Sequence, residues 1–134
     1  MLQKYKFDHI GVACKSIEKE YSFFQKLGYS QISDYFEDKN QGIRGLFIKA
    51  EGQPTLELLE NLNENGPLTN ILKKGNKFYH FAYETDDIEQ DFNNFVEKEK
   101  CIVISPIKRA VYYHKVAFCM LPNMTMIEFV QYTE

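Results

Sequence analysis

Two histidines and two glutamates recur at one spacing along the chain. His9 and His80 are separated by the same number of positions as Glu57 and Glu128, because 80 − 9 equals 128 − 57. Each histidine is therefore followed by a glutamate at one constant separation, since 57 − 9 equals 128 − 80. Imidazole nitrogen and carboxylate oxygen are good donors for borderline divalent ions such as Mn, Fe, Co, Ni and Zn. Four such ligands would leave coordination positions for water or substrate, which is the property that separates a catalytic metal from a structural one.

The offset from His9 to His80 also brings other side chains into register, which indicates a duplicated unit. A duplication of this kind fixes the architecture before any argument from local propensity begins. We interpret the chain as two copies of one module, and each copy presents one His and one Glu. The further matches at this offset are Ile17 with Ile88, Glu18 with Glu89, Tyr21 with Phe92, Phe24 with Phe95, Phe47 with Phe118, and Leu56 with Ile127.

In the first copy, the elements that must position these residues follow the order β-α-β-β-β. Ser16 is a good N-cap, and a helix with Ile17, Tyr21, Phe24 and Leu27 on one face should end at Gly28. Strands are predicted over residues 7–13, 29–36, 43–50 and 55–59.

The second copy repeats that order. Asp87 takes the place of Ser16 as the helix cap, and Gln90 lies three residues on, as in a capping box. The buried helix face should carry Ile88, Phe92 and Phe95, together with Val96. Strands are predicted over residues 78–84, 102–105, 115–121 and 126–132, and a short helix over residues 67–74 of the connector.

Both candidate glutamates have apolar neighbours on either side. Because side chains alternate across a strand, these neighbours should face the helix and the carboxylates should point to the opposite face of the sheet. If that face lines a cleft, the two His and two Glu converge there; if it is flat and wet, nothing further follows. The flanking residues are Leu56 and Leu58 around Glu57, and Ile127 and Phe129 around Glu128.

Length and composition favour one globular domain over residues 1–134. Module one should span about residues 5–62, the connector about 63–76 and module two about 77–134. The net charge of −3 indicates no nucleic-acid partner, and the chain has no apolar run of the ~18 residues needed to span a membrane. Three scattered cysteines fit a reduced, cytoplasmic protein better than a disulfide framework.

Several segments resemble the vicinal oxygen chelate superfamily, which includes glyoxalase I, bleomycin resistance proteins and extradiol dioxygenases. These segments contain the four candidate ligands, and the run after Glu57 is similar to that of methylmalonyl-CoA epimerase-like proteins. The resemblance covers nearly the whole chain. It is carried by FDHIGVA (residues 7–13), QGIR (41–44), TLELLENLNENGPL (55–68), HFAYETDDI (80–88) and MIEF (126–129).

The resemblance implies an α+β fold in which two tandem βαβββ modules form a half-open barrel, usually as a homodimer. It implies a divalent metal ion on His9, Glu57, His80 and Glu128, and a metal-dependent isomerase, epimerase or lyase that acts at the carbon α to a carbonyl or thioester. The substrate would be a small molecule such as an acyl-CoA or an α-keto compound. The metal would stabilise an enolate, and Glu128 or Glu57 would move the proton.

The sequence departs from the epimerase pattern where an acid, the proposed catalytic base, precedes the Gln-Gly step. Asn40 stands there, and an amide cannot accept a proton at neutral pH. This favours a single-base isomerase or lyase over a two-base epimerase. The loops before the last two strands also differ from the family's, which changes the pocket rim. Two alternatives remain at this stage: a metal-free protein of the same fold that sequesters a small molecule, and an Fe(II) dioxygenase.

Overall fold

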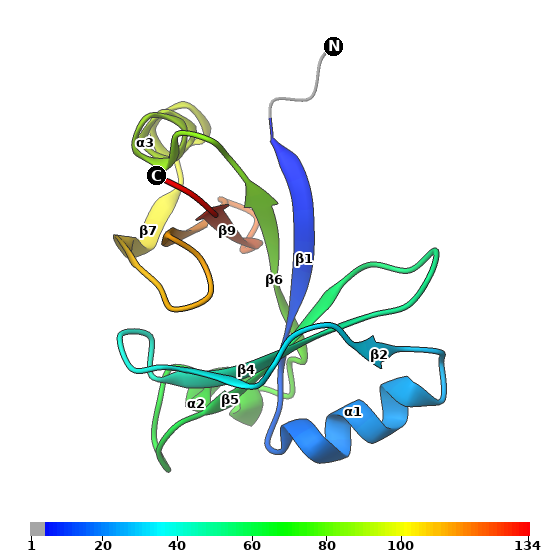
Figure 1. Cartoon of the computed structure of the whole chain (residues 1–134). Helices are drawn as coiled ribbons and strands as arrows, with labels where there is room; N and C mark the ends of the chain where they lie inside the picture. The colour runs from blue at the N-terminus through cyan, green and yellow to red at the C-terminus, as the bar shows by residue number, and fades with distance from the viewer. Residues whose placement is uncertain (1–4) are drawn as a thin grey trace. The chain divides into compact units, whose positions relative to one another are not determined.

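The computed structural model describes residues 5–134. The residues before Tyr5 lie outside the described part. Strands outnumber helices, and the predicted α+β class is confirmed (Figure 1). In chain order, the elements within residues 5–134 are β1 (Lys6–Ala13), α1 (Ile17–Gln25), β2 (Ser30–Gln31), β3 (Phe36–Asp38), β4 (Ile43–Lys49), β5 (Leu56–Asn61), α2 (Thr69–Lys73), β6 (Phe78–Glu84), α3 (Ile88–Glu99), β7 (Ile102–Arg109), β8 (Lys115–Met120) and β9 (Met126–Gln131).

The chain forms two compact units. The N-terminal unit comprises His9–Tyr79, and the C-terminal unit comprises His80–Glu134 together with the segment that ends at Asp8. In the N-terminal unit the strand order is β2-β4-β5-β1, and β3 also pairs with β4. In the C-terminal unit the order is β6-β9-β8-β7. Each unit has one parallel pair, β1 with β5 and β6 with β9, and its other strand pairs are antiparallel.

Strand register repeats at the offset found in the sequence. Gly11 lies opposite Glu57 in the N-terminal unit, and its counterpart in the second copy, Ala82, lies opposite Glu128 in the C-terminal unit. On their other sides, Glu57 and Glu128 pair with Phe47 and Phe118, which are also matched at this offset. The two units therefore present matched residues at the same sheet positions.

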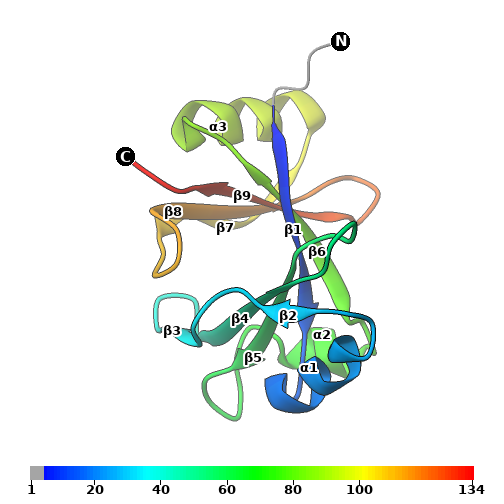
Figure 2. The same cartoon turned by 45° about the vertical axis from the view of Figure 1, so that its right-hand side comes forward.

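In each unit a helix covers one face of the sheet, as predicted from the apolar neighbours of the glutamates. Helix α1 packs on β4 and β5 (Figure 1). Ile17 is fully buried in a cluster that contains Leu56 and Leu58. Helix α3 packs on β7, β8 and β9 (Figure 2). Ile88 and Phe92 lie in a cluster that contains Ile127 and Phe129. The glutamates therefore occupy the sheet face opposite to the helix.

Both predicted helix caps are confirmed. The Ser16 side chain accepts a hydrogen bond from the backbone N–H of Lys19, and the Asp87 side chain accepts one from the backbone N–H of Gln90. The cap side chain satisfies a backbone donor that the first turn leaves without an intrahelical partner.

Two details of the predicted first module are wrong. A strand does not run through residues 29–36, because the Ser33 hydroxyl accepts the backbone N–H of Phe47 where a strand carbonyl would otherwise pair. Helix α1 ends at Gln25, so Leu27 lies beyond it and is 62% exposed instead of buried. Gly28 still takes the left-handed backbone conformation, with φ +97, that a glycine after a helix provides.

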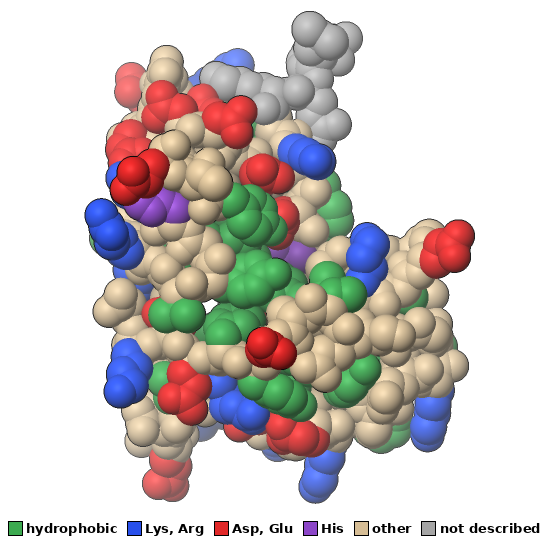
Figure 3. Space-filling view, in the orientation of Figure 1, with side chains coloured by type: hydrophobic (Ala, Val, Ile, Leu, Met, Phe, Trp, Pro, Cys, Tyr) green, Lys and Arg blue, Asp and Glu red, His purple; other side chains and the backbone are tan. Residues whose placement is uncertain are grey.

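Within residues 5–134, no helix combines the length and the apolar character that crossing a membrane requires. On the face drawn in Figure 3, Lys and Arg side chains are mixed with Asp and Glu side chains. This mixture agrees with the small net charge of −3.

Candidate functional site

The N-terminal unit holds the first histidine–glutamate pair. His9 lies on β1 and Glu57 on the neighbouring strand β5, and both point to the face that α1 leaves uncovered. The Nε2 atom of His9 lies 2.9 Å from Oε1 of Glu57. His9 is 0% exposed and Glu57 is 5% exposed. Burying a carboxylate is costly unless a partner compensates it, so this placement needs a hydrogen-bond donor or a cation.

The C-terminal unit holds the second pair in the same arrangement. His80 lies on β6 and Glu128 on the neighbouring strand β9. The Nε2 atom of His80 lies 3.0 Å from Oε1 of Glu128, and both residues are buried. The predicted ligands are thus brought together two by two, one pair in each unit, through the same atoms.

The geometry of each pair fits a metal ligand set. Adjacent ligands that each lie about 2.1 Å from one ion, at right angles to each other, are separated by about 3 Å, which is the separation found in both pairs. A direct hydrogen bond from imidazole N–H to carboxylate gives the same distance. The donor types favour a borderline divalent ion over Ca²⁺ or Mg²⁺, which prefer oxygen ligands.

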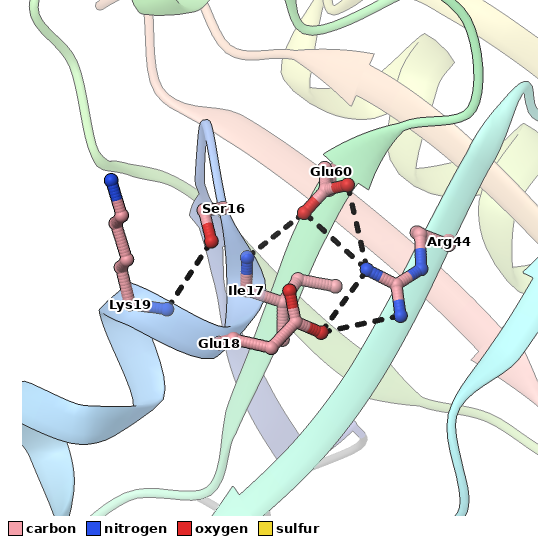
Figure 4. Close-up of polar contacts among 6 residues, drawn as sticks. All are labelled: Ser16, Ile17, Glu18, Lys19, Arg44 and Glu60. Atoms are coloured by element: carbon pink, nitrogen blue, oxygen red, sulfur yellow. Dashed lines mark hydrogen bonds and ion pairs between the residues drawn. The ribbon is translucent and has the colours of Figure 1, made fainter.

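A polar brace between helix and sheet fixes the strand that carries Glu57 (Figure 4). The Glu60 carboxylate, three residues further along β5, accepts the backbone N–H of Ile17 at 2.9 Å. Arg44 of β4 lies 3.4 Å from Glu60 and 3.3 Å from Glu18. The pKa of Glu18 is lowered, first by a hydrogen bond from its own backbone N–H and then by the charge of Arg44. The start of α1 is thereby tied to both β4 and β5.

The C-terminal unit has the corresponding brace. Gln131 takes the place of Glu60 and accepts the backbone N–H of Ile88 at 2.8 Å. Lys115 and Glu89 replace Arg44 and Glu18 as the ion pair, and the hydrogen bond from Lys115 lowers the pKa of Glu89. The sequence prediction missed this feature, although the offset from His9 to His80 also relates Glu60 to Gln131 and Arg44 to Lys115.

Asn40, which stands where the family resemblance predicts an acid, lies in the turn between β3 and β4. Two residues earlier, Asp38 is fully buried, and its side chain accepts hydrogen bonds from the backbone N–H (3.2 Å) and Nε2 (2.9 Å) of Gln41. Glu37 is exposed. Asp38 therefore supports the turn that carries Asn40, and Gly42 closes that turn at a φ of +75.

A cavity of about 570 Å³ lies in the N-terminal unit, beside α1. Its lining residues include Lys15, Lys19, Phe23, Leu72 and Lys77. None of the four candidate ligands lines it, so this cavity and the His9–Glu57 pair are separate features of the unit.

Comparison with known proteins supports the superfamily assignment. Residues 8–118 match the model of the family described as the glyoxalase/bleomycin resistance protein/dioxygenase superfamily. Mitochondrial methylmalonyl-CoA epimerase of Mus musculus is 28% identical over 85 residues, which is 62% of this chain and 47% of that protein. The match therefore spans about half the length of this curated relative.

Solved structures share the fold over almost the whole chain. A hypothetical protein from Bacillus halodurans C-125 is 26% identical and has a TM-score of 0.84, over 98% of this chain and 97% of that chain. A variant of Streptomyces coelicolor methylmalonyl-CoA epimerase in complex with 2-nitronate-propionyl-CoA is 22% identical and has a TM-score of 0.81. That match covers 98% of this chain and 100% of the Streptomyces chain.

Proposed function

Because the chain belongs to the glyoxalase/bleomycin resistance protein/dioxygenase superfamily, we propose that it is a metal-dependent isomerase, epimerase or lyase. It acts at the carbon α to a carbonyl or thioester. His9, Glu57, His80 and Glu128 each offer one ligand atom. We propose that these four residues are the ligands of one divalent ion.

The observation that carries this proposal is the duplicated, buried histidine–glutamate pair. A single buried pair is adequately explained as a hydrogen bond that stabilises the sheet. Two pairs with the same atoms at 2.9 and 3.0 Å, at the same register positions, are better explained by a shared ligand requirement. A protein that only sequesters an apolar molecule does not need these four residues.

The chemistry follows from the residues. The bound ion would supply Lewis acidity toward a substrate oxygen, which acidifies the neighbouring C–H bond. Glu128 or Glu57 then accepts the α-proton on a carboxylate oxygen and returns it to the substrate. General-base help of this kind contributes roughly 10²–10⁴-fold to the rate. Burial of both carboxylates keeps bulk water from competing for that proton.

Asn40 makes one-base chemistry the preferred form of the proposal. An asparagine amide binds a substrate oxygen or N–H by hydrogen bonding but cannot accept the α-proton. With one carboxylate in action, the proton leaves and returns on the same face, or a leaving group departs. An isomerase or lyase therefore fits the site better than an epimerase that uses two bases on opposite faces.

The proposed substrate is an acyl-CoA or an α-keto compound, and the proposed assembly is a homodimer. Support for the acyl-CoA comes from the named activity of the mouse relative and from the complex formed by the Streptomyces protein. Support for the homodimer is the resemblance to the superfamily.

The first test is the metal content of protein purified without chelator, measured by elemental analysis. The His9→Ala/His80→Ala double variant is the test protein. His114→Ala is the matched control, because His114 is the third histidine of the chain and lies outside both pairs. We expect Mn, Fe, Co, Ni or Zn in the wild type and in His114→Ala, and none in the double variant.

The second step is exchange of the α-proton of acyl-CoA and ketone substrates in ²H₂O, followed by NMR. Exchange that needs the ion and is lost in Glu128→Gln or Glu57→Gln supports the proposal. A wild type that stays metal-free after reconstitution with each ion would contradict it and favour a metal-free binding protein. Iron-dependent oxygen uptake would indicate a dioxygenase instead.

A further inference from the structure

In the N-terminal unit, an aromatic ring stands against the first imidazole. The rings of Phe47 and His9 have centroids 5.3 Å apart and planes at 87°. Phe47 is 2% exposed and lies directly opposite Glu57 across the β4–β5 ladder. The same ring therefore borders both members of the pair.

The C-terminal unit repeats this arrangement. The rings of Phe118 and His80 have centroids 5.1 Å apart and planes at 87°, and Phe118 lies opposite Glu128 across the β8–β9 ladder. The two phenylalanines are matched at the same offset as the ligands, since 118 − 47 equals 80 − 9. Each unit thus holds a set of three residues, His, Phe and Glu, in one geometry.

An edge-to-face contact constrains an imidazole in a way that an aliphatic neighbour cannot. The attraction between the ring quadrupoles favours the perpendicular orientation, and rotation of the imidazole about its Cβ–Cγ bond would break that contact. The Nε2 atom is the one aimed at the glutamate in both pairs. Holding the imidazole plane therefore holds Nε2 in position.

We propose that Phe47 and Phe118 are positioning residues for the imidazoles of His9 and His80. This inference rests on the proposed function. An imidazole whose Nε2 is already in position loses little conformational entropy when it binds a metal ion. Outer-shell contacts that orient a ligand typically change metal affinity by about 10–100-fold.

The rings of Phe47 and Phe118 differ in how many neighbouring rings hold them in place. The ring of Phe36 stacks on Phe47, with centroids 5.8 Å apart and planes at 21°. Gly45 leaves the space for Phe36, because a Cβ there would collide with the Phe36 ring. The counterpart of Phe36 in the second copy is Ile107, which packs in the helix-side cluster instead. Phe47 thus contacts a ring on each of two sides. We therefore expect substitution of Phe118 to free its histidine more than substitution of Phe47 does.

The experiment compares Phe118→Met, which keeps an apolar side chain of similar length without a ring, with Phe118→Tyr, which keeps the ring. Phe95→Met is the matched control: Phe95 is also partly buried, but its ring contacts Tyr5 and Phe129. The first measurement is the Kd for Co²⁺ from chelator competition and the visible spectrum of the cobalt protein. The second is the ¹H–¹³C NMR spectrum of the histidine rings in metal-free protein, where three histidines give three assignable sets.

We expect Phe118→Met to broaden the His80 ring signals beyond the shift that loss of the ring current alone causes, with the signals of His9 and His114 unchanged, and to raise the Kd for Co²⁺ by on the order of tenfold. Phe118→Tyr and Phe95→Met should stay close to wild type. Phe47→Met should act in the same way on the His9 signals.

His80 signals as sharp as those of the wild type in a folded Phe118→Met protein would overturn the positioning role, whatever the protein does with metal. Equal effects of Phe95→Met on the His80 signals would overturn it as well, since the change would then follow any loss of packing. A wild type that binds no Co²⁺ would contradict the proposed function, and the ring signals of the metal-free protein would still decide the role of Phe118.

Discussion

At the scale of single residues, burial controls the chemistry of the cysteines. Burial raises the pKa of the Cys14 thiol to about 12, with a further contribution from the charge of Glu20, and burial raises that of Cys119 to about 12 as well. Both residues belong to the packed face under a helix. They are core residues, and neither is part of a histidine–glutamate pair.

We predict that iodoacetamide at pH 8 labels Cys14 and Cys119 only when the protein unfolds. A rise in pKa from 9.0 to about 12 reduces the thiolate fraction on the order of a thousandfold, and the thiolate is the species that reacts. Mass spectrometry of peptides from native and urea-unfolded protein measures this. Cys101, which is partly exposed, is the internal comparison. Rapid labelling of native Cys14 would contradict the assignment.

The same shift predicts a loss of stability in alkali. The folded state keeps its thiol protons up to about pH 12, whereas unfolded thiols lose theirs near 9.0. The folded state therefore binds more protons between these values, and its free energy of unfolding falls as the pH rises through that window. Urea unfolding at pH 8 and pH 10.5 should show a smaller fall for Cys14→Ala than for the wild type. Equal falls would indicate that other groups dominate.

Gly45 has no side chain, and this leaves the space in which the Phe36 ring stacks on Phe47. We predict that Gly45→Ala lowers the free energy of unfolding by about 1–3 kcal/mol, because the added methyl group must displace the Phe36 ring. Gly52→Ala is the comparison for a glycine with open space around it, although its φ of +73 adds backbone strain. Chemical denaturation gives both values. A Gly45→Ala protein as stable as the wild type would show that Phe36 moves without cost.

At the scale of elements, the starts of α1 and α3 are each held by a residue of the last strand of the same unit. Glu60 and Gln131 perform the same capping contact, so Glu60→Gln should keep the bond to Ile17 and lose only the ion pair with Arg44. We predict a loss below about 1 kcal/mol for Glu60→Gln and about 1–2 kcal/mol for Glu60→Leu. Urea denaturation of the two variants tests this. Equal losses would mean that the charge, and not the cap, carries the stability.

Much of the fold could be predicted from the sequence because the repeat and the alternation of side chains are local signals. Ser16 and Asp87 predict where the two helices begin. The apolar neighbours of Glu57 and Glu128 predict which face of each sheet the helix covers. The break in the strand at residues 32–35 could not be predicted, because it depends on a bond from Phe47 to the Ser33 hydroxyl, between residues well separated in the sequence.

Part of the candidate site could likewise be predicted from the sequence, and part could not. The four candidate ligands could be predicted from the sequence, because residue type and spacing repeat together. From the sequence, Phe47 and Phe118 could be recognised only as residues that match in the repeat. Their contacts with the histidines could not be predicted, since nothing in the sequence indicates that Phe47 lies beside His9. The module bounds near residues 5–62 and 77–134 stay a prediction.

At the scale of the whole molecule, the central claim is that two histidine–glutamate pairs share one divalent ion. Sharing has a consequence that independent sites do not have. Under this proposal, loss of either histidine should empty the site, because each pair supplies only two of the four proposed ligands. A bound ion should also stabilise the fold, since anything that binds the folded state alone shifts the unfolding equilibrium.

The measurement that tests this claim most directly is the metal stoichiometry of the wild type and of the single variants His9→Ala and His80→Ala. All are reconstituted with the same ion, desalted and analysed for metal per chain. We predict close to one ion per chain in the wild type and in His114→Ala, and almost none in either of the other variants. Two ions in the wild type and one in each single variant would show that the pairs bind independently. A wild type without metal would show that they are hydrogen bonds of the sheet.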